Sequence, residues 1–125
     1  MKRARSFSAE PQSVGAARRF AVAALDDAPL DVLEAVKLMV SELATNSIRH
    51  AETGFQLTIC RAQGAIRVEV TDHAGGTPVM RSPGPEDPSG RGLRIVAMLS
   101  EAWGVDRAAA VGKTVWFTLS AAAPS

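Results

Sequence analysis

The chain has 125 residues, a formal net charge of +1 and a hydrophobic fraction of 46%. This length is enough for one domain, which we expect to span residues 1–125, and too short for two. A charge so near zero argues against direct binding of nucleic acid, because proteins that bind it usually carry a marked basic surplus. The sequence has no apolar run for a membrane helix or a signal peptide, and its lone Cys60 cannot form an internal disulfide. We therefore expect a cytoplasmic protein.

The first part of the sequence predicts a strand and two helices. A short strand is expected over 4–9 and a helix over 11–25, with a proline in its first turn. Asp31 occupies a cap position for a second helix, and Glu34 three residues later resembles its capping-box partner. This helix reaches His50 along a stripe formed by Leu33, Val36, Val40, Leu43, Ala44 and Ser47.

Two alternating segments around Gln63-Gly64 predict a β-hairpin with a two-residue turn. Apolar residues alternate with polar ones on both sides of this turn, so one face of the hairpin is apolar and the other polar. The turn sets the expected cross-strand pairs, which are Ile59 with Val68, Leu57 with Val70, Phe55 with Asp72, Thr58 with Glu69, and Cys60 with Arg67.

The last part of the sequence predicts a loop, a helix and a second hairpin. The ten residues from Arg81 to Gly90 include three prolines and two glycines, a composition typical of loops. A short helix is expected from near Gly90, followed by strands over 102–107 and 113–119 and a frayed tail over 121–125. The order of elements predicts an α/β fold of the two-layer α+β sandwich type, with a mostly antiparallel, mixed sheet and helices on one face.

Three groups of residues are candidates for binding a ligand or for catalysis. Glu42, Asn46 and His50 are four residues apart and share one helix face, as a functional cluster or as a solvated polar stripe. Asp72 continues the apolar face of its strand, where it would bind a ligand amino group or would act as a turn or capping residue. The run from Gly90 to Leu93 opens a helix, and a glycine-rich helix N-terminus suits phosphate.

Taken together, these segments resemble the motifs of the GHKL ATPases, which have the Bergerat fold. Residues 40–51 resemble the N-box, 70–78 the adenine-binding G1 box, 90–96 the G2 box, and 112–117 the strand motif that carries an adenine-side threonine. The four motifs occur in family order. The chain is most similar to the small anti-sigma-factor serine kinases and to related histidine-kinase-like ATP-binding regulators of actinobacteria.

The resemblance implies a role for each matching residue, with ATP and Mg²⁺ as cofactors. Glu42 would be the catalytic base, and Asn46 would bind the Mg²⁺ ion that bridges the phosphates. Asp72 would accept a hydrogen bond from the adenine amino group, with Thr114 supporting it through water. Residues 79–89 would form the ATP lid. The other residues expected to bind the nucleotide are Gly76, Gly90, Arg91, Gly92 and Leu93.

The resemblance leaves two functions open. The first is an anti-sigma regulatory factor with serine/threonine kinase activity toward an anti-anti-sigma antagonist, with that antagonist and a sigma factor as partners. The second is a regulatory module that binds ATP and partners without kinase activity, which is favoured by Ala74 in place of the first G1-box glycine. If Thr114 faces the nucleotide, Val115 and Phe117 lie on the outer face of the sheet, where an apolar patch would allow homodimerisation.

Overall fold

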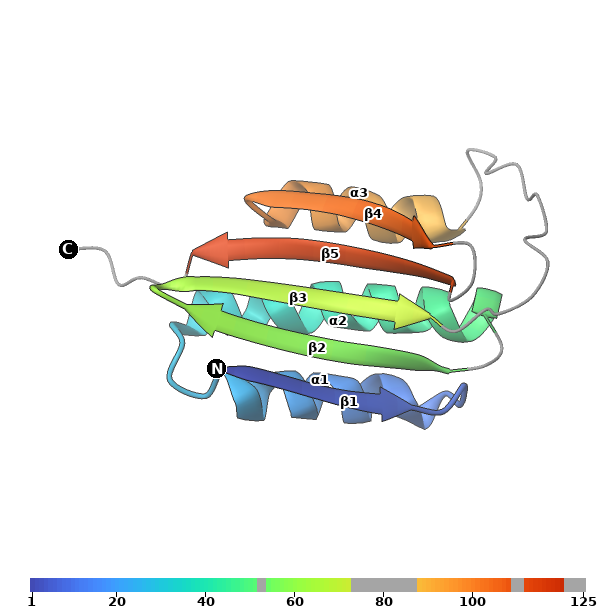
Figure 1. Cartoon of the computed structure of the whole chain (residues 1–125), viewed down its shortest axis with the longest axis horizontal. Coiled ribbons are helices and arrows are strands. Elements are labelled where there is room, and N and C mark those ends of the chain that lie inside the picture. Colours follow the sequence, from blue (N-terminus) through green and yellow to red (C-terminus); the bar gives the residue numbers. More distant parts are fainter. Residues whose placement is uncertain (52–53, 73–87, 109–111, 121–125) are drawn as a thin grey trace.

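Figure 1 shows a computed structural model of the chain, which describes residues 1–51, 54–72, 88–108 and 112–120. One five-stranded sheet has the strand order β1-β2-β3-β5-β4, and three helices lie together on one of its faces. The elements are β1 (Lys2–Phe7), α1 (Gln12–Ala24), α2 (Leu30–Ala51), β2 (Phe55–Ala62), β3 (Ala65–Asp72), α3 (Pro88–Leu99), β4 (Ala102–Ala108) and β5 (Gly112–Ser120). This confirms the two-layer α+β sandwich. The sheet that we expected to be mixed is antiparallel in all of its described pairings.

The hairpin of β2 and β3 has the register that the sequence predicts. All five expected cross-strand pairs are present, from Phe55 with Asp72 to Cys60 with Arg67. Gln63 and Gly64 form the turn with φ angles of 53° and 77°, and two successive positive φ angles are the mark of a type I′ turn. Because the turn and the apolar pattern agree on one register, this hairpin positions Asp72 at the end of β3 on the helix-facing side.

Two elements begin earlier than the sequence predicts. The first strand covers Lys2–Phe7 rather than residues 4–9, because all six of its residues pair with β2 and the amino group of Met1 donates to the carbonyl of Arg61 at 2.9 Å. The third helix begins at Pro88, two residues before Gly90. A proline suits the first position of a helix, where its missing N–H is not needed.

The predicted cap of the second helix is wrong. The helix begins at Leu30, and the carbonyl of Pro29 accepts the N–H of Leu33 at 3.0 Å, so Asp31 already lies inside the first turn. The Asp31 carboxylate accepts the N–H of Val32 at 2.9 Å, and Glu34 forms an ion pair with Lys37 rather than a capping box. Asp31 is still favourable there, because a carboxylate in the first turn complements the helix dipole.

The core lies between the sheet and the helices. It is formed by small residues of α1, the apolar stripe of α2 and the inner residues of the central strands, including Phe55, Leu57, Val68 and Phe117, all of which are fully buried. Phe117 and Val115 therefore belong to the core, which corrects the expectation that they form an outer apolar patch for homodimerisation. In the part of the chain that the structure describes, no helix is both long and apolar enough to cross a membrane.

Candidate functional site

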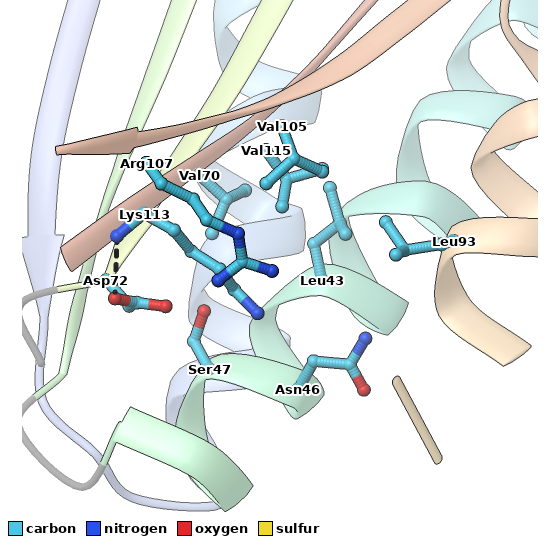
Figure 2. Close-up of a pocket in the computed structure, with 10 residues that line it drawn as sticks. All are labelled: Leu43, Asn46, Ser47, Val70, Asp72, Leu93, Val105, Arg107, Lys113 and Val115. Atoms are coloured by element: carbon cyan, nitrogen blue, oxygen red, sulfur yellow. Dashed lines mark hydrogen bonds between the residues drawn. The ribbon is translucent and has the colours of Figure 1, made fainter. Parts of the chain in front are cut away.

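A pocket lies where the ends of three strands meet the helices α2 and α3 (Figure 2). The space between its lining residues is about 400 Å³, a figure that includes open solvent. Its walls combine apolar side chains with a few polar and charged ones. The lining residues are Leu43, Asn46, Ser47, Val70, Asp72, Leu93, Val105, Arg107, Lys113 and Val115.

Asp72 lines one side of this pocket. It is the last residue of β3 and follows Ile66, Val68 and Val70 at every second position, so its carboxylate points to the buried face of the sheet. Its side chain is only 5% exposed, and its Oδ1 accepts the backbone N–H of Lys113 at 3.2 Å. A carboxylate among apolar side chains is costly unless it accepts hydrogen bonds. Asp72 is therefore placed to accept a ligand N–H.

Asn46 lies across the pocket from Asp72, on α2 (Figure 2). It is 8% exposed and its neighbour Ser47 is 6% exposed, so this part of the helix face is not a solvated polar stripe. The sequence alone left that alternative open. Asparagine is an unfavourable residue in the interior of a helix, at about 0.7 kcal/mol against alanine. A buried asparagine that lines a cavity is thus a candidate ligand-binding residue.

Gly92 allows α3 to pack directly against this face of α2. A Cβ atom added to Gly92 would lie 2.5 Å from Nδ2 of Asn46 and 3.6 Å from Cβ of Glu42. Real Cβ atoms essentially never come as close as the first of these distances, so only glycine fits beside Asn46 as the structure stands. The predicted G2 glycine is thus in contact with the predicted N-box.

Glu42 lies one helical turn before Asn46, on the same face of α2. It is partly exposed, lies beside Gly92, and is not among the residues that line the pocket. The Cβ atom of Glu42 therefore lies at the boundary between α2 and α3. His50, one turn after Asn46, belongs to α2, and its side chain lies outside the described part of the structure.

The N-terminus of α3 is next to the pocket. In a helix that begins at Pro88, the N–H groups of Ser89 and Gly90 precede the first backbone hydrogen bond of the helix, whereas that of Arg91 falls within it. Those of Gly92 and Leu93 fall opposite the carbonyls of residues 88 and 89. Of the two residues expected to offer amides at this end, Gly90 thus has an N–H available for an anion. Gly92 provides close packing, and Leu93 provides an apolar side chain in the pocket.

Thr114 is not in the pocket, which corrects its expected role beside the adenine. Val70 and Val115 are cross-strand partners on the inner face, so Thr71 and Thr114, the next pair along, point to the opposite face. Their hydroxyl oxygens are 2.8 Å apart there. The inner side of β5 presents Val115 to the pocket instead.

Two pocket residues were missed by the sequence analysis, Arg107 and Lys113. Both line the cavity, and they are cross-strand partners on β4 and β5. A signal was available, since Lys113 is two residues before Val115 and Arg107 is two residues after Val105. Residues two apart on a strand share a face, so the correct face for β5 would have identified both cations.

Several predicted site residues lie outside the described ranges. These are Gly76 and, within the expected lid, residues 79–87, together with Ala74. Among the described residues, no three His, Cys, Asp or Glu side chains come close enough together to hold a metal ion by themselves.

Comparison with known protein families gives one result. Residues 7–119 match the model of the histidine kinase-like ATPase domain. Comparison with curated protein sequences gives no match. The matched segment contains every residue that lines the pocket, the elements from α1 to β4 and all of β5 except its last residue, and it confirms the resemblance to the GHKL-type ATPases. The chain belongs to the histidine kinase-like ATPase domain family.

Proposed function

We propose that this chain is an ATP-binding anti-sigma regulatory factor that phosphorylates an anti-anti-sigma antagonist on serine or threonine. Membership of the family supports ATP binding and ATP-dependent phosphoryl transfer in general. ATP binding at this site is supported by one observation, the arrangement of Asp72 and Asn46 on opposite sides of a single pocket with Glu42 one turn away, and the anti-sigma assignment rests on the resemblance of the motifs. Its proposed partners are a sigma factor and the antagonist.

The pocket suits a purine nucleotide. The buried carboxylate of Asp72 would accept a hydrogen bond from the adenine amino group, and Leu43, Val70 and Val115 provide apolar surface for a flat ring. The side-chain oxygen of Asn46 would bind Mg²⁺, a cation that keeps several waters and needs few protein ligands. The free amides of α3 are near enough to the pocket to hold phosphate oxygens.

When bound, ATP supplies the phosphoryl group that is transferred. Glu42 would accept the proton of a serine hydroxyl of the antagonist, which makes that oxygen a better nucleophile. The positions of Asn46 and of the α3 amides would hold the phosphates still and offset their charge, and positioning with charge neutralisation accounts for most of the catalysis of phosphoryl transfer. Val70 and Val115, which lie on the strands next to Asp72 and Lys113, would exclude water from the adenine end of the pocket.

The second candidate function is a regulatory module that binds ATP and protein partners without kinase activity. One observation favours it, because Glu42 lies beside Gly92 rather than among the residues that line the described pocket. A base so placed reaches the reacting oxygen only if the substrate protein brings its hydroxyl to the boundary of α2 and α3. This candidate uses the same nucleotide pocket and differs only at the catalytic step.

Two measurements separate these functions. Calorimetric titration with ATP and Mg²⁺ should give saturable binding for both, and no heat at millimolar ATP would exclude both. Incubation with γ-labelled ATP and an antagonist protein should transfer the label to a serine or threonine of the antagonist. Binding without transfer would favour the module that lacks kinase activity.

A further inference from the structure

A row of three charged side chains crosses the inner face of the sheet at the pocket. Asp72 comes from β3, Lys113 from β5 and Arg107 from β4, and all three line the cavity. Arg107 and Lys113 are cross-strand partners, and the register that pairs Thr71 with Thr114 brings Asp72 beside Lys113. Lys113 is therefore the middle member of the row, directly next to the carboxylate.

The position of Lys113 is fixed by that carboxylate. Its backbone N–H donates to Oδ1 of Asp72 at 3.2 Å, so the two residues stay about one strand spacing apart, which is roughly 4.8 Å. Lysine side chains on a sheet usually extend into water. That of Lys113 is only partly exposed, and it extends from the sheet into the space between Asp72 and α2 (Figure 2).

Apart from Asp72 and Arg107, the neighbours of Lys113 on this face of the sheet are apolar, as expected where a flat adenine ring binds. Val70 and Val115 flank it on the sheet, and Leu43 faces them from α2. Asn46, which would hold the metal and with it the phosphates, belongs to the opposite wall of the pocket (Figure 2). The Lys113 side chain thus enters the pocket from the residue next to Asp72 and passes the apolar side chains Val70 and Val115 on its way toward α2.

We propose that Lys113 reads the base, with its ammonium group donating to ring nitrogen N1 of adenine while Asp72 accepts from the neighbouring amino group. This inference rests on the proposed binding of ATP. The Watson–Crick edge of adenine presents a donor next to an acceptor, which complements an acceptor next to a donor in the protein. Guanine presents a carbonyl oxygen to Asp72 and an N–H to the ammonium, so both contacts become repulsive. The pair therefore selects adenine and rejects guanine.

The test combines one substitution with one change in the ligand. The ligand is an ATP analogue in which a C–H group replaces N1 of adenine, and its affinity is compared with that of ATP by calorimetry with Mg²⁺. The full chain is used as wild type, as Lys113→Met, and as Lys37→Met. Lys37 lies on the exposed side of α2 in an ion pair with Glu34 and is the matched control.

The wild type should bind ATP about tenfold more tightly than the analogue, as expected for one hydrogen bond to a charged donor. Lys113→Met should bind ATP about tenfold more weakly than the wild type and should bind both ligands alike. Lys37→Met should keep the wild-type preference. The comparison of ligands on the wild type needs no variant, so equal binding of the two ligands overturns the inference even where Lys113→Met folds poorly.

Two results would overturn the inference while leaving ATP binding intact. In the first, the wild type binds ATP and the analogue equally, which means that N1 is not read. In the second, Lys113→Met weakens both ligands by the same factor and keeps the preference between them, which assigns the ammonium to the phosphates. Failure of the wild type to bind ATP at all is a different outcome, because it removes the proposed function itself.

Discussion

At the scale of single residues, the proposed function assigns ATP binding and catalysis to different side chains, so the two can be tested separately. Glu42 and Asn46 are one helical turn apart on α2, yet only Asn46 lines the pocket. Substitution of Glu42 by Gln keeps the shape of the side chain and removes the base, so transfer of label to the antagonist should be lost while ATP affinity changes less than about twofold. Calorimetry and label transfer on the same preparation check both halves. Unchanged transfer would exclude Glu42 as the base.

Asn46 should behave in the opposite way. Substitution of Asn46 by Ala removes an amide oxygen from the pocket and should weaken binding of ATP in the presence of Mg²⁺. The expected loss is on the order of ten- to a hundredfold, as for other groups that hold or orient a metal. The same titration without Mg²⁺ is the control, since the variant and the wild type should then differ little. An equal loss with and without the metal would contradict a role in metal binding.

Substitution of Asp72 tests whether adenine binds at its end of the pocket. Substitution by Asn keeps the volume of this buried side chain and can keep the bond from the N–H of Lys113, which leaves the fold intact. It removes the negative charge that favours an amino group on the ligand. Affinity for ATP should fall by about tenfold or more, since a hydrogen bond to a charged group contributes about 1.5–3 kcal/mol. An adenosine titration should show the same loss, because the contact is with the base.

At the scale of elements, the sequence predicts well where two local patterns agree. The register of β2 and β3 was predictable because a two-residue turn and an apolar alternation point to one pairing. The side of β5 that faces the helices was assigned wrongly, because the resemblance placed Thr114 beside the nucleotide although Val115, Phe117 and Leu119 form the more apolar face of that strand. That choice decided the roles of Thr114 and Lys113. The meeting of Asp72 with Asn46 is non-local, and only the resemblance to a family predicted it.

The contact between α2 and α3 also gives a prediction at this scale. Substitution of Gly92 by Ala places a methyl group against the amide of Asn46, so Asn46 must move and affinity for ATP with Mg²⁺ should fall about tenfold or more. Gly15→Ala in α1 is the matched control, because its methyl group would meet only the mobile ends of Arg18 and Arg19, at 3.7 and 3.2 Å. It should leave ATP affinity unchanged and stabilise the helix by up to about 1 kcal/mol.

At the scale of the whole molecule, the two faces of the sheet differ in what they carry. The inner face carries the core and, at one end, the nucleotide pocket. The outer face, which none of the three described helices covers, is held by contacts among its own side chains (Figure 1). There the Arg67 guanidinium lies 4.3 Å from the centre of the Trp116 ring and donates to Glu69 at 2.8 Å, and the indole lies across Gly104. Stabilisation by ATP should therefore come from the inner layer alone.

Because of this division, the rise in melting temperature on addition of ATP should report binding in the pocket. A ligand that binds only the folded chain at a hundred times its Kd adds about 2.7 kcal/mol to the free energy of unfolding. For a domain of this size the melting temperature should rise by about 10 °C. Asp72→Asn should show a much smaller rise at the same ATP concentration, because its higher Kd lowers the saturation.

Substitution of Trp116 by Phe should lower the melting temperature measured without ligand, because indole contacts on the outer face are lost. The rise in melting temperature caused by ATP should stay unchanged. An increment that disappears in Trp116→Phe would show that the outer face and the pocket are coupled.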